Sequence, residues 1–479
     1  MAIRFLLNGR EQQFDEVEPS ATALDLLRYR LRRTGTKEGC AEGDCGACTI
    51  LLGDLVDGER VAWRAVNACI LFAPMLAGRA VLTIEGVGRD GAPHPVQREM
   101  VARHGSQCGF CTPGIVMSLV GRAMGAEGTR GVSVGDVLSG NLCRCTGYGP
   151  ILAAGEAVGA AAVDDAATVQ ALQAMQDELP DLLSDGNRRA FLPRTADALA
   201  DLLQAHPDAR IIAGASDVGL WVTKKLVDIP VAIFIDRIAE LQQIVEGPQH
   251  VTMGAGVRYA QAWPVLAALH PDLGELVRRI AGTQIRNMGT IGGNIANGSP
   301  IGDMPPALIA LGASIVLRRG SERRTIALED FFIAYGRQDR QAGEFIESIL
   351  IPRLPNDMIF RVMKLSKRFD SDISALCGAF ALRISEGVVR EARIAFGGMA
   401  GTPRRAYACE QVLNGSPWDE ETVERACATL AEDYQPLTDV RGSAEYRLQA
   451  AGNFLRRMWL EPQVDGAPTS LHDPALIDG

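Results

Sequence analysis

Three cysteines lie within ten residues in the stretch GCAEGDCGAC, residues 39–48, and a fourth follows in NACI. Their spacing, C-x4-C-x2-C and then one distant cysteine, is typical of plant-type [2Fe–2S] clusters. Four thiolates converge on two irons in such a site, and a glycine-rich loop brings backbone N–H groups close to sulfur. Zinc is the alternative, but zinc motifs usually pair two short knuckles, and no second one follows here. The predicted cluster ligands are Cys40, Cys45, Cys48 and Cys69.

Four more cysteines lie in two short motifs, QCGFCTPG and NLCRCTGYG, each followed by an apolar segment. Pro113 and Pro150 suit the first turns of two expected helices, whose N-termini would meet at one metal centre and favour negative charge. Taken alone, these pairs fit a zinc ribbon about as well. Beside the plant-type loop, they favour a second [2Fe–2S] cluster held by Cys108, Cys111, Cys143 and Cys145.

The first loop requires a small sheet domain to hold it. Residues 3–7 form a short apolar run, Asn8-Gly9 predicts a two-residue hairpin, and EQQFDEV continues as the return strand. Ser20 is a candidate N-cap for a helix that carries Leu24, Leu27 and Leu31 on one face. TILLG and VLTIEGV supply further strands. These signals predict a β-grasp ferredoxin domain.

Composition limits the class of protein. A length of 479 residues suggests about three or four domains. The formal net charge of -10 argues against a nucleic-acid partner. No stretch approaches the ~18 apolar residues of a membrane span, so we expect a cytoplasmic protein without a membrane partner. Thiols stay reduced there, which favours metal ligation; three cysteines without ligand spacing are expected to be small buried hydrophobes, namely Cys377, Cys409 and Cys427.

The second half of the chain shows a different pattern. Residues 164–190 are acidic and polar and are expected to form a linker. ARIIAGASDVGLWVTKK predicts a strand, a small-residue turn and a helix. Such a turn can cradle a phosphate, but it can also be a plain connection between a strand and a helix. It lacks the G-x-G-x-x-G fingerprint of a Rossmann unit. TIGGNIANGSPIGD contains few large side chains, so its backbone could approach a planar or phosphorylated ligand, although an elaborate turn is the alternative.

In combination, GCAEGDCGAC, NACI, QCGFCTPG and GNLCRCTGY resemble the iron–sulfur region of the molybdenum hydroxylases, the xanthine dehydrogenase and aldehyde oxidase family. AGASDVG and IGGNIANGSPIGD are similar to the family's two FAD-contacting segments. The resemblance implies a multidomain α+β fold. It comprises a plant-type β-grasp [2Fe–2S] domain (1–87), a helical [2Fe–2S] domain (88–163), the linker (164–190), an FAD domain of the vanillyl-alcohol-oxidase-like type (191–355), a C-terminal α+β subdomain (356–465) and a tail (466–479).

The resemblance also implies site residues. Asp303 would hold ribityl or ribose hydroxyls, Lys364 would lie near the flavin ring, and Ile280 stands where the family usually has an aromatic side chain. The pyrophosphate would be lined by Ile211, Ile212, Ala213, Gly214, Ala215, Ser216, Asp217 and Val218, and then by Thr290, Gly292, Gly293, Asn294 and Asn297. Acceptor-site candidates are Tyr335, Asp370 and Asp372, with Ser371 in place of an acid found in some relatives. Gln107 and Cys145 would lie against a pterin on a partner subunit.

The same resemblance implies a role for the chain. It is similar to the small subunit of bacterial members of the family, with a molybdopterin-binding large subunit as partner in an (αβ)2 heterotetramer. The expected activity is that of xanthine dehydrogenase: hypoxanthine and xanthine are oxidised to urate on the partner, and electrons pass through two [2Fe–2S] clusters to FAD and NAD. One alternative is the equivalent subunit of another molybdenum hydroxylase that oxidises aldehydes or N-heterocycles. Another is a stand-alone electron-transfer flavoprotein.

Overall fold

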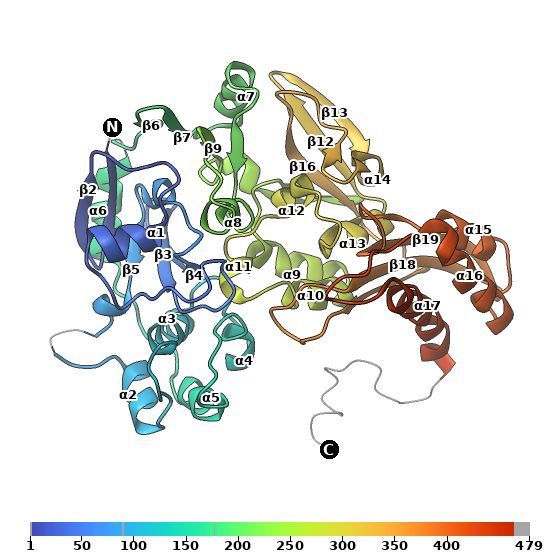
Figure 1. Ribbon diagram of the computed structural model, residues 1–479, viewed down its shortest axis with the longest axis horizontal. Coiled ribbons are helices and arrows are strands. Elements are labelled where there is room, and N and C mark those ends of the chain that lie inside the picture. The colour runs from blue at the N-terminus through green and yellow to red at the C-terminus, as the bar shows by residue number, and fades with distance from the viewer. Residues whose placement is uncertain (1, 89–90, 177, 464–479) are drawn as a thin grey trace.

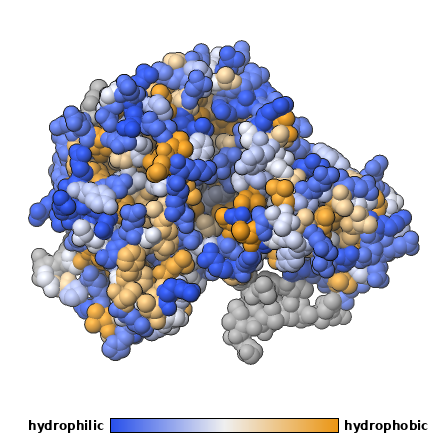
Figure 2. All heavy atoms as spheres, in the orientation of Figure 1, coloured by the Kyte–Doolittle hydropathy of each residue, from blue (hydrophilic) through white to orange (hydrophobic). Residues whose placement is uncertain are grey.

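A computed structural model describes residues 2–88, 91–176 and 178–463. The N-terminal sheet and the helices α2–α5 lie at one end of the molecule, and the C-terminal subdomain lies at the other (Figure 1). Two further sheets lie between them. On the face in Figure 2 the surface is hollowed near its centre, where Figure 1 places α11 and α12. No helix in the described ranges is long and apolar enough to cross a bilayer.

The first sheet has the strand order β2-β1-β5-β3-β4. β1 and β2 form the expected antiparallel hairpin around Asn8 and Gly9, whose φ angles are 53° and 78°. The strands are β1 (Ile3–Leu7), β2 (Arg10–Phe14), β3 (Thr49–Val56), β4 (Arg60–Asn67) and β5 (Ala80–Leu82). The predicted small sheet domain around the first cysteine loop is confirmed.

The expected N-cap at Ser20 is wrong. The helical segment begins as α1 (Ala23–Asp25) and widens into a π-helical turn, η1 (Leu26–Arg30), and its N-cap is Thr22, whose hydroxyl accepts from the Asp25 N–H. The Ser20 hydroxyl instead donates to the Glu18 carboxylate, and Ser20 lies two residues before the capping position.

The second cysteine group lies in a helical domain made of α2 (Pro95–Ala102), α3 (Thr112–Ala123), α4 (Val134–Val137) and α5 (Gly149–Glu156). α3 packs on β3 and β4. Pro113 and Pro150 occupy the first turns of α3 and α5, as predicted. The loops before these two helices therefore carry the cysteine pairs.

The segment 164–190 contains more structure than a plain linker. It includes α6 (Ala166–Gln176) and β6 (Leu182–Asp185). Leu172 and Met175, spaced i, i+3, are buried against the first sheet, and the Trp63 indole N–H donates to the Asp165 carboxylate at 3.2 Å. Val169 and Ala171 also pack against this cluster, so an apolar face of α6 docks the segment on the first sheet.

Residues 182–352, which we call the flavin-type region after the expected FAD domain, contain two larger sheets, β6-β7-β9-β8 and β10-β11-β16-β12-β13. The strands are β7 (Arg188–Phe191), β8 (Arg210–Ile212), β9 (Val231–Phe234), β10 (Ile244–Glu246), β11 (His250–Gly254), β12 (Ser314–Arg319), β13 (Glu322–Ala327) and β16 (Phe345–Pro352), with a small hairpin of β14 (Phe332–Ala334) and β15 (Arg337–Gln338). The helices are α7 (Ala196–Ala205), α8 (Val218–Thr223), α9 (Tyr259–Leu269), α10 (Pro271–Arg278), α11 (Thr283–Arg286), α12 (Ile291–Asn297), α13 (Met304–Ala310) and α14 (Leu328–Phe331).

The first sheet and the flavin-type region share one hydrophobic core. Phe72, which precedes the 3-10 turn η2 (Ala73–Leu76), packs edge-on against Phe234 of β9, with ring centroids 6.0 Å apart. Both rings are fully buried. These two parts of the chain are therefore in direct apolar contact.

The C-terminal subdomain is a four-stranded sheet, β17-β18-β19-β20, against which α15 and α17 pack, and α16 packs on these two helices. Its elements are β17 (Met358–Leu365), β18 (Leu376–Ser385), β19 (Val388–Gly397), β20 (Arg404–Arg405), α15 (Tyr407–Leu413), α16 (Glu420–Asp433) and α17 (Ala444–Leu460). Cys377 and Cys409 are buried as predicted, whereas Cys427 is only half-buried.

Candidate cluster and flavin sites

The first cysteine loop gathers N–H groups and thiols around one point. The Sγ of Cys40 accepts from the backbone N–H groups of Glu42, Asp44 and Cys45 at 3.4, 3.3 and 3.3 Å. The Cys40 thiol also contacts those of Cys45 and Cys69, and Cys69 contacts Cys48. The hydrogen bond from Cys45 lowers the pKa of Cys40, and the same bond raises the pKa of Cys45. Four converging sulfurs and inward N–H groups fit a [2Fe–2S] cluster.

Gly46, between two of these cysteines, is required by space as well as by conformation. Its φ is +69°, and a Cβ there would lie 2.2 Å from the Gly140 carbonyl oxygen. The first cysteine loop is thus pressed against the segment that leads to Cys143.

The second quartet combines exposed and buried thiols. Cys108 contacts Cys145, and Cys111 contacts Cys143. The Phe110 N–H lowers the pKa of Cys108, and burial raises the pKa of Cys111 to about 12. Cys108 and Cys145 are exposed, while Cys143 is buried. One edge of this site therefore faces outward, beside the exposed Gln107. Across the described ranges, no group of three histidine, cysteine or acidic side chains is arranged to hold a single metal ion.

A backbone hydrogen bond joins the two cysteine sites. The N–H of Leu142, next to Cys143, donates to the carbonyl of Cys45 at 3.0 Å. A ligand of one site is thus linked to a ligand of the other through one peptide unit and one hydrogen bond.

The two candidate flavin segments lie side by side. A Cβ on Gly214 would fall 1.7 Å from the Met288 carbonyl oxygen, and a Cβ on Gly289 would fall 3.2 Å from the Ser216 hydroxyl. A Cβ on Gly292 would fall 2.4 Å from that of Ala255. Gly214 and Gly292 are therefore needed for chain packing, a role that the sequence interpretation did not include.

The remaining predicted flavin residues follow from these segments. Ile211 and Ile212 end β8, Ala213 to Asp217 form the turn, and Val218 opens α8. Thr290 is the N-cap of α12, which carries Gly292, Gly293, Asn294 and Asn297. Oδ1 of Asn294 is buried without a hydrogen-bond partner in the described chain, as is the hydroxyl of Tyr259. Such polar atoms fit a cofactor that supplies the missing donors and acceptors.

Asp303 and Lys364 form the charged centre of this region. Lys364 Nζ donates to Asp303 Oδ2 at 2.7 Å and to the Arg279 carbonyl at 3.0 Å, and the Ser374 hydroxyl donates to Asp303 Oδ1. The side chains of Lys364 and Asp303 are 3% and 10% exposed. Ser374 was not predicted, although it closes the stretch KLSKRFDSDIS, residues 364–374, which begins at Lys364. Ile280 packs against the hydrophobic core beside the sheet β10-β11-β16-β12-β13, and it lacks the aromatic ring usual in the family at this position.

The acceptor candidates are less closely grouped. Asp372 accepts from the Arg368 N–H at 2.8 Å, whereas Asp370 is half-buried and burial raises its pKa against the effect of nearby Arg278. Tyr335 is 77% exposed. Within the described ranges no hydrogen bond joins Tyr335 to either aspartate.

Helix α8 connects the flavin segment to the first cysteine loop. The Thr223 hydroxyl donates to the Ala41 carbonyl at 2.7 Å, and Lys224 Nζ donates to the Cys40 carbonyl at 2.6 Å. Neither residue was predicted, because a hydroxyl and an amine on a helix surface carry no spacing signal.

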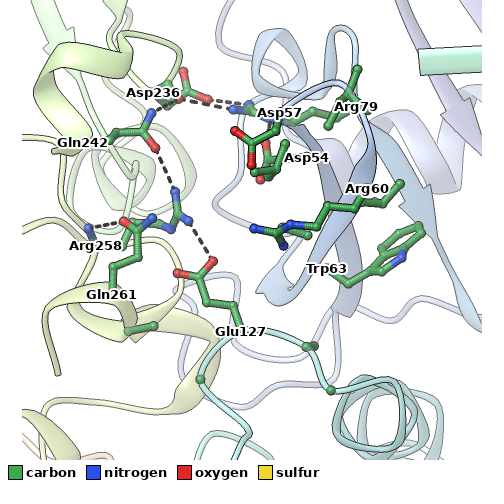
Figure 3. A pocket seen from close by; sticks show the side chains of 18 of the residues that line it. Asp54, Asp57, Arg60, Trp63, Arg79, Glu127, Asp236, Gln242, Arg258 and Gln261 are labelled. Carbon is green, nitrogen blue, oxygen red and sulfur yellow. Dashed lines mark hydrogen bonds and ion pairs between the residues drawn. The ribbon is translucent and has the colours of Figure 1, made fainter. Parts of the chain in front are cut away.

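A separate cavity of about 1270 Å³ opens between the first sheet, the helical domain and the flavin-type region. Figure 3 shows Arg258 joined to Gln242 and Glu127, and Arg79 joined to Asp236. No predicted site residue lines this cavity. It is a polar junction between domains and not the predicted flavin site.

Four family models match the chain in sequence. They are a 2Fe-2S iron–sulfur cluster binding domain at residues 5–73, a [2Fe-2S] binding domain at 83–156, an FAD binding domain in molybdopterin dehydrogenase at 186–354, and a CO dehydrogenase flavoprotein C-terminal domain at 361–462. The two cysteine quartets fall within the first two matches, and the flavin segments fall within the third.

Solved structures give the same assignment. Carbon monoxide dehydrogenase from Hydrogenophaga pseudoflava is 31% identical with a TM-score of 0.53, over 56% of this chain and 94% of that chain. The chain belongs to the molybdenum hydroxylase family. Quinoline 2-oxidoreductase from Pseudomonas putida 86 is 26% identical with a TM-score of 0.52, over 56% of this chain and 94% of its own.

Relatives within the molybdenum hydroxylase family include longer proteins. Xanthine dehydrogenase of Drosophila subobscura is 34% identical over 89% of this chain, and xanthine dehydrogenase/oxidase of Rattus norvegicus is 31% identical over 95%. The chain spans only 36% and 38% of those two proteins. The matches confirm the predicted α+β fold and identify the chain as the iron–sulfur and FAD-binding part of a molybdenum hydroxylase.

Proposed function

We propose that this chain is the electron-transfer and NAD-reducing subunit of a xanthine dehydrogenase. The proposal includes a molybdopterin-binding large subunit as partner, an (αβ)2 heterotetramer, a cytoplasmic location and the oxidation of hypoxanthine and xanthine to urate. The xanthine dehydrogenases that match about nine-tenths of this chain support the choice of substrate. None of the eleven cysteines forms a disulfide in the described residues, in keeping with a reducing compartment.

The hydrogen bonds that connect the sites are the observation that carries the proposal. Cys108 and Cys145 are exposed at the surface of the helical domain, where a partner can approach. Leu142 then links this site to Cys45, and Lys224 links the first cysteine loop to the flavin segment. The chain therefore offers a route that begins at an outer surface and ends at the flavin region.

When bound, the two clusters carry single electrons and FAD converts them into a pair for NAD. The residues of this chain hold those groups in place. Cys40, Cys45, Cys48 and Cys69 would hold one cluster, and Cys108, Cys111, Cys143 and Cys145 the other. Residues 211–218, Thr290, α12 and Asp303 would hold FAD, with Lys364 near its ring. Gln107 and Cys145 would face the partner's pterin, and Tyr335, Asp370 and Asp372 would face NAD.

A second candidate is the same subunit of a molybdenum hydroxylase with another substrate. The solved structures favour it, because they are a carbon monoxide dehydrogenase and a quinoline oxidoreductase. Substrate choice would then depend on the partner and not on this chain.

The test is to purify the native complex through a tag on this chain and to identify the co-purifying polypeptide. The kcat/KM for each candidate substrate is then measured with NAD as electron acceptor. We expect a molybdenum-containing partner and a kcat/KM for xanthine and hypoxanthine at least tenfold higher than that for aldehydes and non-purine N-heterocycles. A preference for either of the latter would favour the second candidate. A chain that carries iron, sulfide and FAD but has no molybdenum partner would instead be a stand-alone electron-transfer flavoprotein.

A further inference from the structure

We infer that Gln284 is a positioning residue that sets the geometry between the two cysteine sites. The inference deepens the proposed electron route and rests on it, since it concerns how the two cluster-binding loops are held together. Gln284 lies on α11 in the flavin-type region, outside both iron–sulfur domains. Its side chain is nevertheless fully buried at their junction.

One amide group of Gln284 contacts both iron–sulfur domains. Nε2 lies 2.9 Å from Asn141 Oδ1, 3.1 Å from the Thr49 hydroxyl and 3.1 Å from the Ser118 hydroxyl. Thr49 belongs to β3 of the first sheet domain, and Ser118 belongs to α3 of the helical domain. Three parts of the chain therefore meet at a single nitrogen atom.

Two of these partners, Thr49 and Asn141, are close in sequence to predicted cluster ligands. Thr49 follows Cys48 directly, and Asn141 precedes Cys143 by two residues. Asn141 Nδ2 and the Thr49 hydroxyl both donate to the carbonyl of Gly46, at 3.3 and 2.6 Å. A displacement of Gln284 would thus be transmitted to both cysteine loops.

The orientation of the amide follows from its surroundings. The Gly46 carbonyl can only accept, so Nδ2 of Asn141 must face it and Oδ1 of Asn141 must face Gln284. Gln284 must then present its NH2 group to Oδ1. A carboxylate of the same shape could not donate there.

The junction has no room for slippage. A Cβ on Gly140 would lie 2.1 Å from Gln284 Oε1, and a Cβ on Gly282 would lie 2.4 Å from the Gly140 Cα. Oε1 itself accepts no hydrogen bond from the described residues.

The hydrogen bond between the two cysteine loops lies directly beside this junction, where the Leu142 N–H donates to the Cys45 carbonyl. Because electron transfer slows steeply with distance, a residue that fixes the separation of the two loops affects the rate between them.

The experiment compares the full-length complex of the wild type with Gln284→Leu and Gln284→Glu, which keep the approximate shape but remove the donors. Iron, sulfide and FAD contents are measured first. EPR of the fully reduced protein then reports the magnetic interaction between the two clusters, and rapid-mixing spectroscopy reports the rate of electron transfer between them. We expect both clusters to be retained, a changed magnetic splitting and a rate lowered at least tenfold.

Gln173→Leu is the matched control, because Gln173 is an exposed glutamine whose side-chain amide donates to the Gly58 carbonyl. It should leave the splitting and the rate unchanged. Wild-type splitting and rate in a Gln284 variant with full cluster content would overturn the inference. If the Gln284 variants do not fold, Ser118→Ala, which removes one partner only, provides the same test with a smaller expected change. Failure of the wild type to bind two clusters would instead refute the proposed function.

Discussion

Lys364 Nζ and Asp303 Oδ2 form a buried ion pair of 2.7 Å between β17 of the C-terminal subdomain and the start of α13. The pair joins two segments that are 61 residues apart in sequence. It therefore closes the C-terminal subdomain onto the segment that is expected to bind the flavin hydroxyls.

Lys364→Met should remove this closure. Loss of one partner from a buried ion pair leaves an uncompensated charge, which lowers the free energy of unfolding by about 3–5 kcal/mol. We expect that loss, together with reduced FAD content, measured by denaturant unfolding and by absorbance of the purified protein. Lys225→Met, at an exposed lysine, is the control. Normal stability and flavin content in Lys364→Met would show that the pair is not needed.

The two cysteine quartets should behave as separate sites. Cys45→Ala and Cys143→Ala are each expected to abolish one [2Fe–2S] EPR signal and to leave the other, because the two variants disturb different thiol groups. Cys427→Ala, at a half-buried cysteine outside both quartets, should retain both signals. Two intact signals in either of the first two variants would contradict the ligand assignment.

Gly214→Ala tests the packing of the two flavin segments. The new Cβ would fall 1.7 Å from the Met288 carbonyl oxygen, and backbone cannot yield as a flexible side chain can. Overpacking of this kind costs about 3 kcal/mol of stability. Thermal unfolding should show a clearly lower midpoint, whereas Gly159→Ala, with no neighbour within 4 Å, should not. Equal midpoints would mean that the two segments are not in contact.

Glu344 gives a prediction for pH. Bidentate hydrogen bonds from Arg324 at 2.7 and 2.8 Å lower the pKa of the Glu344 carboxyl below its ordinary value of 4.5. A depressed pKa contributes stability that is complete above 4.5 and is lost as the pH falls through the folded-state pKa. Glu344→Gln should reduce stability by ~1–3 kcal/mol at neutral pH and flatten its decline below pH 4.5.

Denaturant unfolding at pH values from about 3 to about 7 measures this change. The control is Glu322→Gln, at an exposed glutamate on β13. An unchanged acid limb in Glu344→Gln would mean that the ion pair with Arg324 does not form.

The loop 366–374 should influence the choice of electron acceptor. A carboxylate near the flavin disfavours additional negative charge on its ring, so two-electron transfer to NAD gains over one-electron transfer to oxygen. We expect Asp370→Asn with Asp372→Asn to raise oxygen reduction relative to NAD reduction in the assembled enzyme. The ratio of hydrogen peroxide plus superoxide to NADH, at matched FAD content, is the measurement. Asp330→Asn is the control, because Asp330 lies outside this loop. An unchanged ratio would show that the loop is only a solvated surface.

Local sequence patterns predicted the features that depend on neighbours in the chain. The hairpin at Asn8-Gly9 and the helix starts at Pro113 and Pro150 follow from backbone preferences within a few residues. The first cysteine quartet was predicted from the spacing that cluster ligation imposes on one loop, and the second quartet was predicted only from its occurrence beside the first. The family resemblance then placed the flavin segments.

Features that depend on long-range packing were not readable from the sequence. Gln284, Ser374 and Lys224 act through partners in distant segments, and no spacing marks them. Gly214 was noticed, but as a ligand contact, because its neighbour Met288 is 74 positions away in sequence and only the fold brings the two together. The N-cap was expected at Ser20 but is Thr22, because the helix begins two residues later than the sequence pattern indicated.

The edge-on contact of Phe72 with Phe234 has a consequence for cooperativity. Because both rings belong to one core, the first sheet cannot melt without exposing apolar surface of the flavin-type region. Heating should then release iron and flavin in a single transition, although they are held by different stretches of sequence. A fragment that begins after the helical domain would leave Phe234 uncovered, so it would need a substitute surface to stay folded.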